Sequence, residues 1–185
     1  IQGEADGTQL TETELLHNCV FLLNAGHETT TNLIGNSLVL LCEWPEAREL
    51  LLAEPEHMRS AVEEFLRFES SNQLGNRRAL AETEVGGTVL PAGALVTLCI
   101  GAANRDPAQF SEPDRLDLLR TPNRHLAFGS GAHLCAGHAL ARLEGRVALG
   151  RFLARFPRYR LAGSPVRGGR ARFRGFLAVP ARLRV

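Results

Sequence analysis

Cys135 is the residue of this chain whose setting best suits chemistry. It lies in the segment FGSGAHLCAG, residues 128–137, immediately before a helix-like run, LARLEGRVALGRFLARF. Backbone N–H groups at a helix start favour negative charge, so a thiolate at such a position is stabilised. The segment contains three glycines, Gly129, Gly131 and Gly137. Glycine permits tight turns and lets the backbone approach a flat ligand closely. With Phe128 as an apolar cover, this pattern indicates a ligand-binding sulfur rather than a structural cysteine.

A second segment is polar where a buried helix should be apolar. NAGHETTTN, residues 24–32, lies between the apolar stretches CVFLL and LIGNSLVLL and contains glycine, a carboxylate and threonines. A polar kink that lines a cavity would account for this composition. The alternative is a helix exposed to solvent at its centre, with threonine hydroxyls bonded back to main-chain carbonyls.

Glu64 and Arg67 are three residues apart and lie away from the apolar stripe of their predicted helix, so they face the same side. An exposed pair at this spacing contributes only about 0.2–0.5 kcal/mol. The spacing alone is therefore weak evidence of a functional role.

Local patterns predict the elements that position these residues. Thr11 and Glu14 form a capping box that begins a long helix, which runs to Trp44 and Pro45. A stripe at helical spacing predicts an amphipathic helix: Met58, Ala61, Val62, Phe65 and Leu66. Strand and turn patterns predict a hairpin over residues 81–90, a strand over 94–100 and a short helix starting at 104–107. The predicted fold class is mainly α with small β-sheets.

The cysteine segment resembles the heme-binding signature of the cytochrome P450 family, the heme-thiolate monooxygenases, and the match continues into LAR-x-E at residues 140–144. The resemblance implies that Cys135 is the proximal ligand of the iron of heme b and that His133 points toward a heme propionate. It places the rest of the loop around the cofactor: Phe128, Gly129, Gly131 and Gly137. Because a thiolate ligand favours O–O cleavage, activation of O₂ is the expected chemistry.

AGHETT, residues 25–30, resembles the oxygen-side helix of the same family. The resemblance implies that Ala25 lies at the cofactor and that Gly26 leaves room above the iron. Thr29 would hydrogen-bond dioxygen or its water, and Glu28 would relay protons from solvent. A hydroxyl and a carboxylate suit this task because splitting O–O toward water requires delivered protons. His27 is assigned no catalytic role.

The Glu64 and Arg67 pair resembles the family's Glu-x-x-Arg motif, which locks the loop before the cysteine through an arginine further along the chain. SEPDRLD, residues 111–117, supplies that arginine as Arg115, and Arg120 is the second choice. The implied role is structural.

Arg77 and Arg78 precede the predicted strands, and Arg78 is favoured as the family arginine that pairs with a heme propionate. A surface arginine beside a turn is the alternative. FRGFLAVP, residues 173–180, resembles the family's last hairpin, whose turn reaches over the substrate cavity.

The resemblance covers the C-terminal half of the family's fold: a long I-type helix, the ExxR helix, the meander, the Cys-ligand loop, the following L-type helix and the terminal β-hairpin. Residues 1–185 are therefore expected to be the C-terminal part of a single heme-thiolate monooxygenase domain whose N-terminal part is absent. A soluble, bacterial-type protein is implied.

Composition adds further expectations. The chain has 185 residues with 44% hydrophobic content, as expected for one globular domain. It shows neither a signal peptide nor a spanning helix, so a cytoplasmic location without a membrane partner is expected. The cysteines are widely separated and show no CxxC pairing, so disulfides are not expected, and the lack of CxxCH excludes a c-type heme. Burial in apolar runs is expected for three of them: Cys19, Cys42 and Cys99.

The resemblance also implies a reaction and its partners: one oxygen atom from O₂ would be inserted into a small apolar organic substrate. Electrons would come from NAD(P)H through a reductase and a ferredoxin or flavodoxin-type donor.

Net charge is +1, but most carboxylates lie early in the chain and most of the 21 basic residues, all arginines, lie late. These arginines imply an anionic partner or local ion pairs. An acidic electron donor could meet Arg124, Arg142 and Arg146.

Three alternatives stay open. His133, Cys135 and His138 could present a zinc-like ligand set, although no fourth ligand is apparent. RGGRARFRGF, residues 167–176, could bind nucleic acid through arginine and phenylalanine, although no nucleic-acid partner is expected. The chain could also be a truncated heme-binding or non-catalytic fragment of such an enzyme.

Overall fold

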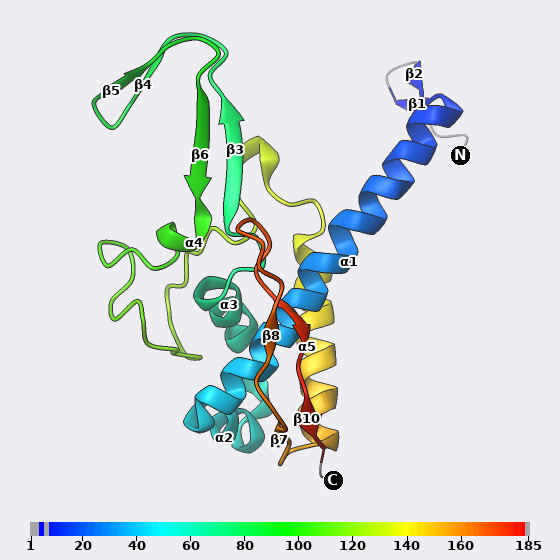
Figure 1. Ribbon diagram of the computed structural model, residues 1–185, viewed down its shortest axis with the longest axis vertical. Coiled ribbons are helices and arrows are strands. Elements are labelled where there is room, and N and C mark those ends of the chain that lie inside the picture. Colours follow the sequence, from blue (N-terminus) through cyan, green and yellow to red (C-terminus); the bar gives the residue numbers. More distant parts are fainter. Residues whose placement is uncertain (1–3, 6–7, 184–185) are drawn as a thin grey trace.

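The computed structural model describes residues 4–5 and 8–183 as a mainly helical protein with small β-sheets, which confirms the predicted fold class (Figure 1). The helices are α1 (Glu12–Glu43), α2 (Pro45–Ala53), α3 (Met58–Phe68), α4 (Ile100–Ala103) and α5 (His138–Arg155), with the 3-10 helices η1 (Pro55–His57) and η2 (Gly131–His133). The strands are β1 (Glu4–Ala5), β2 (Thr8–Gln9), β3 (Leu74–Arg78), β4 (Thr83–Val85), β5 (Thr88–Leu90), β6 (Leu95–Cys99), β7 (Arg160–Leu161), β8 (Val166–Arg167), β9 (Phe176–Ala178) and β10 (Ala181–Arg182). Within the described part of the chain, no helix combines the length and the apolar character that crossing a membrane requires.

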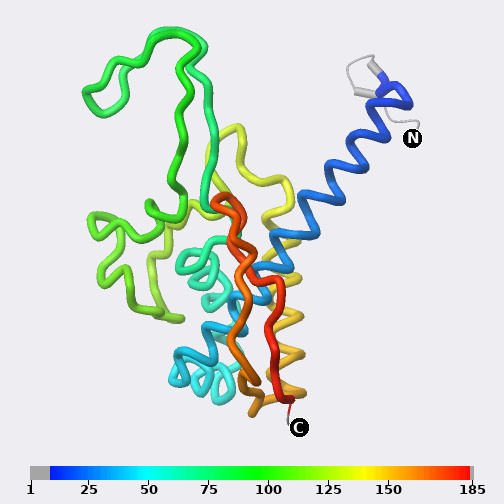
Figure 2. The backbone as a smooth tube through the Cα atoms, viewed as in Figure 1, coloured from blue at the N-terminus to red at the C-terminus, as the bar shows by residue number. Residues whose placement is uncertain are grey.

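Helix α1 begins where the capping box predicts. The Thr11 hydroxyl accepts a hydrogen bond from the Glu14 backbone N–H at 3.2 Å, and the Glu14 carboxylate accepts one from the Thr11 N–H at 2.9 Å. The helix ends at Glu43 because helical backbone is disfavoured before a proline, while Pro45 suits the first turn of α2. Figure 2 shows that the N-terminal half of α1 projects away from the remaining chain.

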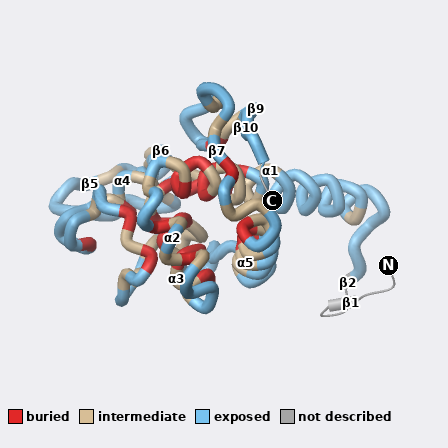
Figure 3. The backbone as a smooth tube through the Cα atoms, turned by 90° about the horizontal axis from the view of Figure 1, so that it is seen from below, coloured by how far each residue is buried: buried red, intermediate tan, exposed pale blue. Residues whose placement is uncertain are grey.

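The core lies where the C-terminal half of α1 meets α2, α3 and α5, and Figure 3 shows buried residues gathered there. The predicted stripe of α3 is confirmed, since all of its members are buried: Met58, Ala61, Val62, Phe65 and Leu66. They pack with Leu33 and Leu41 of α1 and with Leu149 and Leu153 of α5. The N-terminal half of α1 carries exposed apolar side chains instead: Leu16, Val20, Phe21, Leu22 and Leu23.

Each named strand of the described residues lies in a two-stranded antiparallel sheet, and an isolated antiparallel bridge pairs Asn72 with Phe173. β4 and β5 form the hairpin predicted over residues 81–90, and Gly86 and Gly87 turn the chain between them with φ of 58° and 78°. β6 confirms the strand predicted over residues 94–100, and it pairs with β3, which the sequence did not suggest. The expectation of a helix starting at residues 104–107 is wrong. The helix in this region, α4, lies before them: it ends at Ala103, and Asn104 is its C-cap residue.

The hairpin expected over residues 173–180 is wrong in its pairing. β9 pairs with β8, and β10 pairs with β7, so the Arg/Gly-rich residues 168–175 form the turn between β8 and β9. We call residues 168–175 the terminal turn. The Asn36 side chain donates to the Arg174 carbonyl at 3.0 Å, and the Gln73 N–H donates to the Arg172 carbonyl at 2.8 Å. These bonds hold the terminal turn against α1 and the start of β3.

Candidate functional site

Cys135 lies in an exposed turn between η2 and α5. Its N–H donates to the Phe128 carbonyl at 2.9 Å, and its own carbonyl accepts from the N–H of His138, the first residue of α5, at 3.2 Å. Gly129 and Gly131 adopt φ of 71° and 67°, which residues with side chains rarely do. The loop thus wraps its backbone around Cys135 and leaves the thiol exposed, as binding a flat ligand requires.

The other predicted members of the loop surround this turn. His133 ends η2 and is exposed, and Gly137 is the N-cap residue of α5. A Cβ atom on Gly137 would lie 3.9 Å from the Cys135 Sγ atom. The half-buried Phe128 ring packs toward α5, with its centroid 4.5 Å from the Arg142 guanidinium carbon. A side chain at position 137 would therefore lie against the sulfur atom.

The burial expected for the other cysteines is largely wrong. Cys19 and Cys99 are exposed and only Cys42 is partly buried, while all four cysteines are free thiols. Cys19 lies on the projecting half of α1, and Cys99 ends the edge strand β6, so an apolar sequence neighbourhood did not lead to burial.

The polar segment of α1 remains helical throughout, so the predicted kink does not interrupt the helix. The Thr29 hydroxyl donates to the Ala25 carbonyl at 2.9 Å, and the Thr31 hydroxyl donates to the His27 carbonyl at 2.8 Å. This is the back-bonding expected from the alternative interpretation. Gly26 is nevertheless open, because a Cβ atom built on it would meet nothing within 4 Å.

A groove of about 580 Å³ separates this part of α1 from α5. It is lined by Gly26, His27, Thr30, Thr31 and Ile34 of α1 and by Leu143, Glu144, Val147 and Ala148 of α5. Because α1 and α5 pack on each other, the structure places Gly26 and the Cys135 loop on adjoining elements. Glu28 and Thr29 do not line this groove.

Glu28 instead faces the terminal turn and forms an ion pair with Arg170. Glu69 pairs with two more arginines of the same region, with Arg167 at 3.2 Å and Arg174 at 2.6 Å. Three of the four arginines of the segment proposed for nucleic-acid binding, Arg167, Arg170 and Arg174, therefore pair with carboxylates of α1 and of the residue that follows α3. Nothing in the sequence pattern connected position 28 with position 170.

The Glu64 and Arg67 pair is buried, so the alternative of an exposed surface pair does not apply. Both side chains are 0% exposed, and Arg67 binds the carboxylate through two parallel hydrogen bonds of 2.8 Å. The carboxylate also accepts the Asp117 N–H at 2.9 Å and the Asn123 side chain at 3.0 Å. These additional donors compensate for burial of the charge.

The choice of Arg115 as the partner of this pair is wrong, and the second choice, Arg120, is the residue in contact. Arg120 Nε lies 3.2 Å from Glu64 Oε2, whereas the Arg115 side chain is exposed and lies 3.5 Å from Glu112. Arg115 contributes its main-chain carbonyl, which accepts from Arg67 at 3.2 Å. Sequence distance could not distinguish the two arginines because the backbone turns between them.

The network extends to the residues that precede the cysteine loop. Arg67 donates to the carbonyls of Asn104 and Pro113, each at 2.9 Å. The fully buried Asn104 side chain donates to the Ser70 hydroxyl at 2.8 Å and accepts the Leu126 N–H at 2.7 Å. The long segment between α4 and η2 is thereby tied to α3.

A second ion-pair cluster was not predicted. Glu63 lies 3.0 Å from His125, and it accepts bidentate hydrogen bonds of 2.7 and 2.9 Å from Arg142 of α5. Burial raises the pKa of Glu63, but the hydrogen bonds from His125 and Arg142 outweigh it and lower the pKa to about 2. The three residues join α3, the segment before the cysteine loop and α5, and Arg142 is engaged within the protein.

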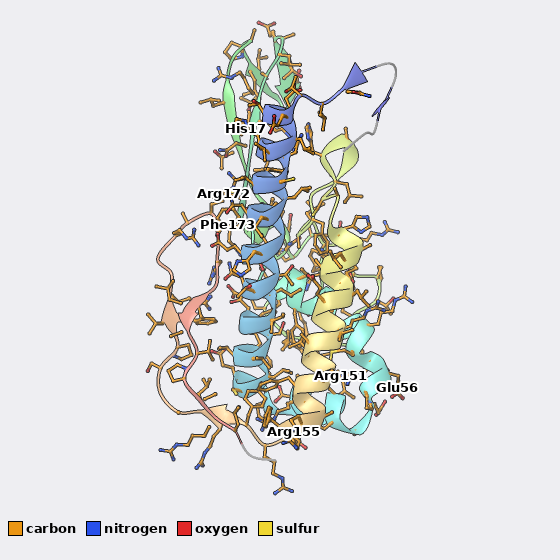
Figure 4. The ribbon with its side chains drawn as sticks, turned by 90° about the vertical axis from the view of Figure 1, so that its right-hand side faces the viewer. His17, Glu56, Arg151, Arg155, Arg172 and Phe173 are labelled. Atoms are coloured by element: carbon orange, nitrogen blue, oxygen red, sulfur yellow. The ribbon has the colours of Figure 1, made fainter. Side chains whose placement is uncertain are left out.

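Glu63 is expected to make the protein sensitive to acid. Its pKa is lowered from 4.5 to about 2, so its stabilising effect is complete above pH 4.5 and is lost as the pH falls toward 2. Glu63→Gln should therefore weaken the fall in the free energy of unfolding across this interval, measured by urea unfolding at several pH values. Glu56→Gln, at an exposed residue of η1 (Figure 4), should leave that fall unchanged. An identical pH dependence in the Glu63 variant and the wild type would contradict the assignment.

The two candidate propionate arginines lie at the end of β3. Arg78 donates to the Gly93 carbonyl at 3.1 Å, and Arg77 donates to the Asn76 carbonyl at 2.8 Å. As neighbours on a strand they face opposite sides of the sheet. Arg78 is thus already engaged with the turn before β6.

The zinc alternative has no ligand set. Among residues 4–5 and 8–183, no group of three or more His, Cys, Asp or Glu side chains is placed to hold a metal ion. His138 faces Arg142 instead, with 2.8 Å between His138 Nδ1 and Arg142 Nη1.

Comparison with known proteins gives a consistent result. The family model described as "Cytochrome P450" matches residues 1–160. The chain is 46% identical over 166 residues to cytochrome P450 107B1 of Saccharopolyspora erythraea, covering 89% of this chain and 41% of that protein. It is 47% identical over 161 residues to the vitamin D(3) 25-hydroxylase of Pseudonocardia autotrophica, covering 86% of this chain and 40% of that protein. The chain thus spans about 40% of the length of these curated relatives.

Solved structures of cytochrome P450 proteins are similar to this chain as well. P450BioI, solved in complex with an acyl carrier protein ligated to hexadec-9Z-enoic acid, superposes with a TM-score of 0.93 at 41% identity and covers 95% of this chain and 46% of that chain. CYP109E1 from Bacillus megaterium, solved in complex with testosterone, superposes with a TM-score of 0.95 at 34% identity and covers 100% of this chain and 52% of that chain.

Proposed function

The chain belongs to the cytochrome P450 family, and on that premise we propose that it carries the cysteine ligand and the oxygen-side helix of a heme-thiolate monooxygenase. The proposed reaction inserts one atom of O₂ into a small apolar organic substrate. The observation that supports it best is the exposed Cys135 thiol, held in a glycine loop at the start of a helix that packs against α1.

The residues present fit heme b. An accessible sulfur and an open Gly26 would leave space for a planar group. Cys135 would hold the iron, and His133 with Arg78 would bind propionates. The remaining contacts would come from Ala25, Phe128, Gly129, Gly131 and Gly137. When bound, a heme with a thiolate ligand supplies oxygen activation, because electron density from sulfur favours O–O cleavage.

The chain's own contribution to the reaction is the movement of protons along α1. Thr29 donates its hydroxyl proton to the Ala25 carbonyl at 2.9 Å, so the oxygen lone pairs remain as acceptors. Glu28, the preceding residue, holds a carboxylate 33% exposed to solvent and paired with Arg170. We assign Thr29 as the hydroxyl that hydrogen-bonds dioxygen or its water at the centre of the site, where its free lone pairs can accept from that water, and Glu28 as the group that exchanges protons with solvent.

Glu64, Arg67 and Arg120 are proposed as the structural lock of the cysteine loop, since their network ties the preceding segment to α3. Electrons would arrive from NAD(P)H through a reductase and a ferredoxin or flavodoxin-type donor. Of the arginines considered for that donor, Arg124 is exposed whereas Arg142 is bound to Glu63. We therefore assign Arg124 to the donor surface and exclude Arg142 from it.

The apolar substrate is supported by the names of relatives, which refer to vitamin D(3) and testosterone. We further propose that residues 1–185 form the C-terminal part of a single monooxygenase domain, since the curated relatives are more than twice as long as the aligned part. On this proposal, turnover requires the other part of that domain, and residues 1–185 alone act as a non-catalytic heme-binding fragment.

Cysteine substitution tests the ligand assignment. In the whole protein, the ferrous carbon monoxide complex should show the strongly red-shifted Soret band of thiolate ligation, and Cys135→Ser should abolish that band. Cys19→Ser, which removes another exposed thiol from α1, should retain it. A wild-type band typical of imidazole ligation, or no heme uptake, would reject Cys135 as the ligand.

A further inference from the structure

A second cavity lies between the terminal turn and the start of β3. Its volume is about 490 Å³. It is lined by Gln73, Leu74, Cys99 and Ala102 on one side and by Arg167, Gly168, Gly169, Arg170, Ala171, Phe173, Arg174 and Gly175 on the other. Three of these residues are arginines and none is acidic, so the walls carry only positive charge. Figure 4 shows the terminal turn, marked by Arg172 and Phe173, beside the middle of α1.

The carboxylates that pair with these arginines, those of Glu69 and Glu28, compensate only part of this positive charge. Arg167 and Arg174 share one carboxylate, that of Glu69, and each contacts it through a single nitrogen atom. A guanidinium has five N–H donors, so both retain donors for a further acceptor. Their side chains are 43% and 52% exposed, which leaves them accessible to a ligand. Arg170 is 55% exposed and pairs only with Glu28 among the described residues.

Apolar side chains complete the cavity and determine what could occupy it. Leu74, Ala102 and Phe173 contribute hydrocarbon surface next to the arginines. A ligand that satisfies both surfaces has an apolar body and an anionic end, since guanidinium binds carboxylate in a planar, bidentate manner. A neutral apolar ligand would bury the remaining N–H donors of these arginines without an acceptor, which is unfavourable.

We propose that this cavity binds the carboxylate of an otherwise apolar substrate and that Arg170 is the residue that determines this specificity. The proposal rests on the proposed function in one respect, because Arg170, which lines the cavity, pairs with Glu28 of α1, the helix assigned to the oxygen side. Arg170 is singled out because it both lines the cavity and binds Glu28. A substrate carboxylate that engages Arg170 competes with Glu28, so substrate binding releases the Glu28 carboxylate.

Binding measurements on the whole protein test this proposal directly. Isothermal titration calorimetry should show that dodecanoate, below its micelle concentration, binds on the order of ten-fold more tightly than dodecanamide, its neutral counterpart. Arg170→Gln should abolish this preference. Glu28→Gln should strengthen dodecanoate binding by several-fold, because it removes the competing carboxylate.

Arg172→Gln is the matched control. It removes the same charge from the same turn, but Arg172 does not line the cavity. Both arginines lie near the Phe173 ring, with the guanidinium carbon of Arg172 at 5.3 Å and that of Arg170 at 5.6 Å from its centroid. This variant should keep the preference for dodecanoate. Equal affinities for the two probes in the wild type, or a preference that survives Arg170→Gln, would overturn the proposal. The heme assignment is tested separately by the carbon monoxide spectrum, so either proposal can fail without the other.

Discussion

Glu64→Gln should lower the free energy of unfolding by about 3–5 kcal/mol, the loss typical of a buried ion pair deprived of one partner. The substitution leaves the Arg67 guanidinium 0% exposed without a counter-ion. It also weakens the acceptor of the Asp117 N–H and of Asn123. Chemical denaturation monitored by circular dichroism measures this change.

Two arginine variants serve as comparisons for Glu64→Gln. Arg115→Ala removes an exposed side chain at 3.5 Å from Glu112 and should cost at most about 1 kcal/mol. Arg120→Ala removes a guanidinium that is 9% exposed and contacts Glu64, so it should cost more than Arg115→Ala. A loss in Glu64→Gln no larger than in Arg115→Ala would show that the buried pair does not stabilise the fold.

Thr29→Ala should reduce product formation by the whole enzyme about 10²-fold and divert its electrons into hydrogen peroxide. The proposed reason is the loss of the hydroxyl that hydrogen-bonds dioxygen or its water at the centre of the site. The ratio of product to NAD(P)H consumed, together with the peroxide released, measures the effect. Heme content and the carbon monoxide spectrum should stay unchanged, because Thr29 is assigned no part in holding the cofactor.

Thr31→Ala provides the control within the same helix. Thr31 makes the same kind of bond as Thr29, from its hydroxyl to the carbonyl four residues earlier, at 2.8 Å instead of 2.9 Å. Two residues along a helix correspond to a rotation of about 200°, so the two hydroxyls face nearly opposite sides. Coupling should therefore be intact in Thr31→Ala. Equal uncoupling in both variants would indicate a general effect on the helix and would remove the special role of Thr29.

The sequence predicted the features that depend on near neighbours. The capping box needs only Thr11 and Glu14, and the stripe of α3 needs only one helical face, so both were confirmed. The glycine loop at Cys135 was also recognisable, because its turns need particular backbone conformations within a few residues. Its exposed thiol agrees with that interpretation.

Features that depend on distant segments were missed or wrongly assigned. Glu28 and Arg170 are 142 positions apart, and only the packing of the terminal turn on α1 brings them together. The pairing of Glu63 with Arg142 depends in the same way on the packing of α3 against α5. Burial of Glu64 could not be read from an E-x-x-R spacing, since the donors that make burial tolerable come from residues 117–123.

The bond between the Asp117 N–H and the Glu64 carboxylate has a consequence for local opening. The segment between α4 and η2 has no regular secondary structure, and such segments usually exchange their amide hydrogens rapidly with solvent. Here the amide of Asp117 can exchange only when its bond to the buried Glu64 carboxylate breaks. This irregular segment therefore belongs to the same cooperative unit as the helical core, and its rigidity comes from bonds to buried side chains rather than from a backbone ladder.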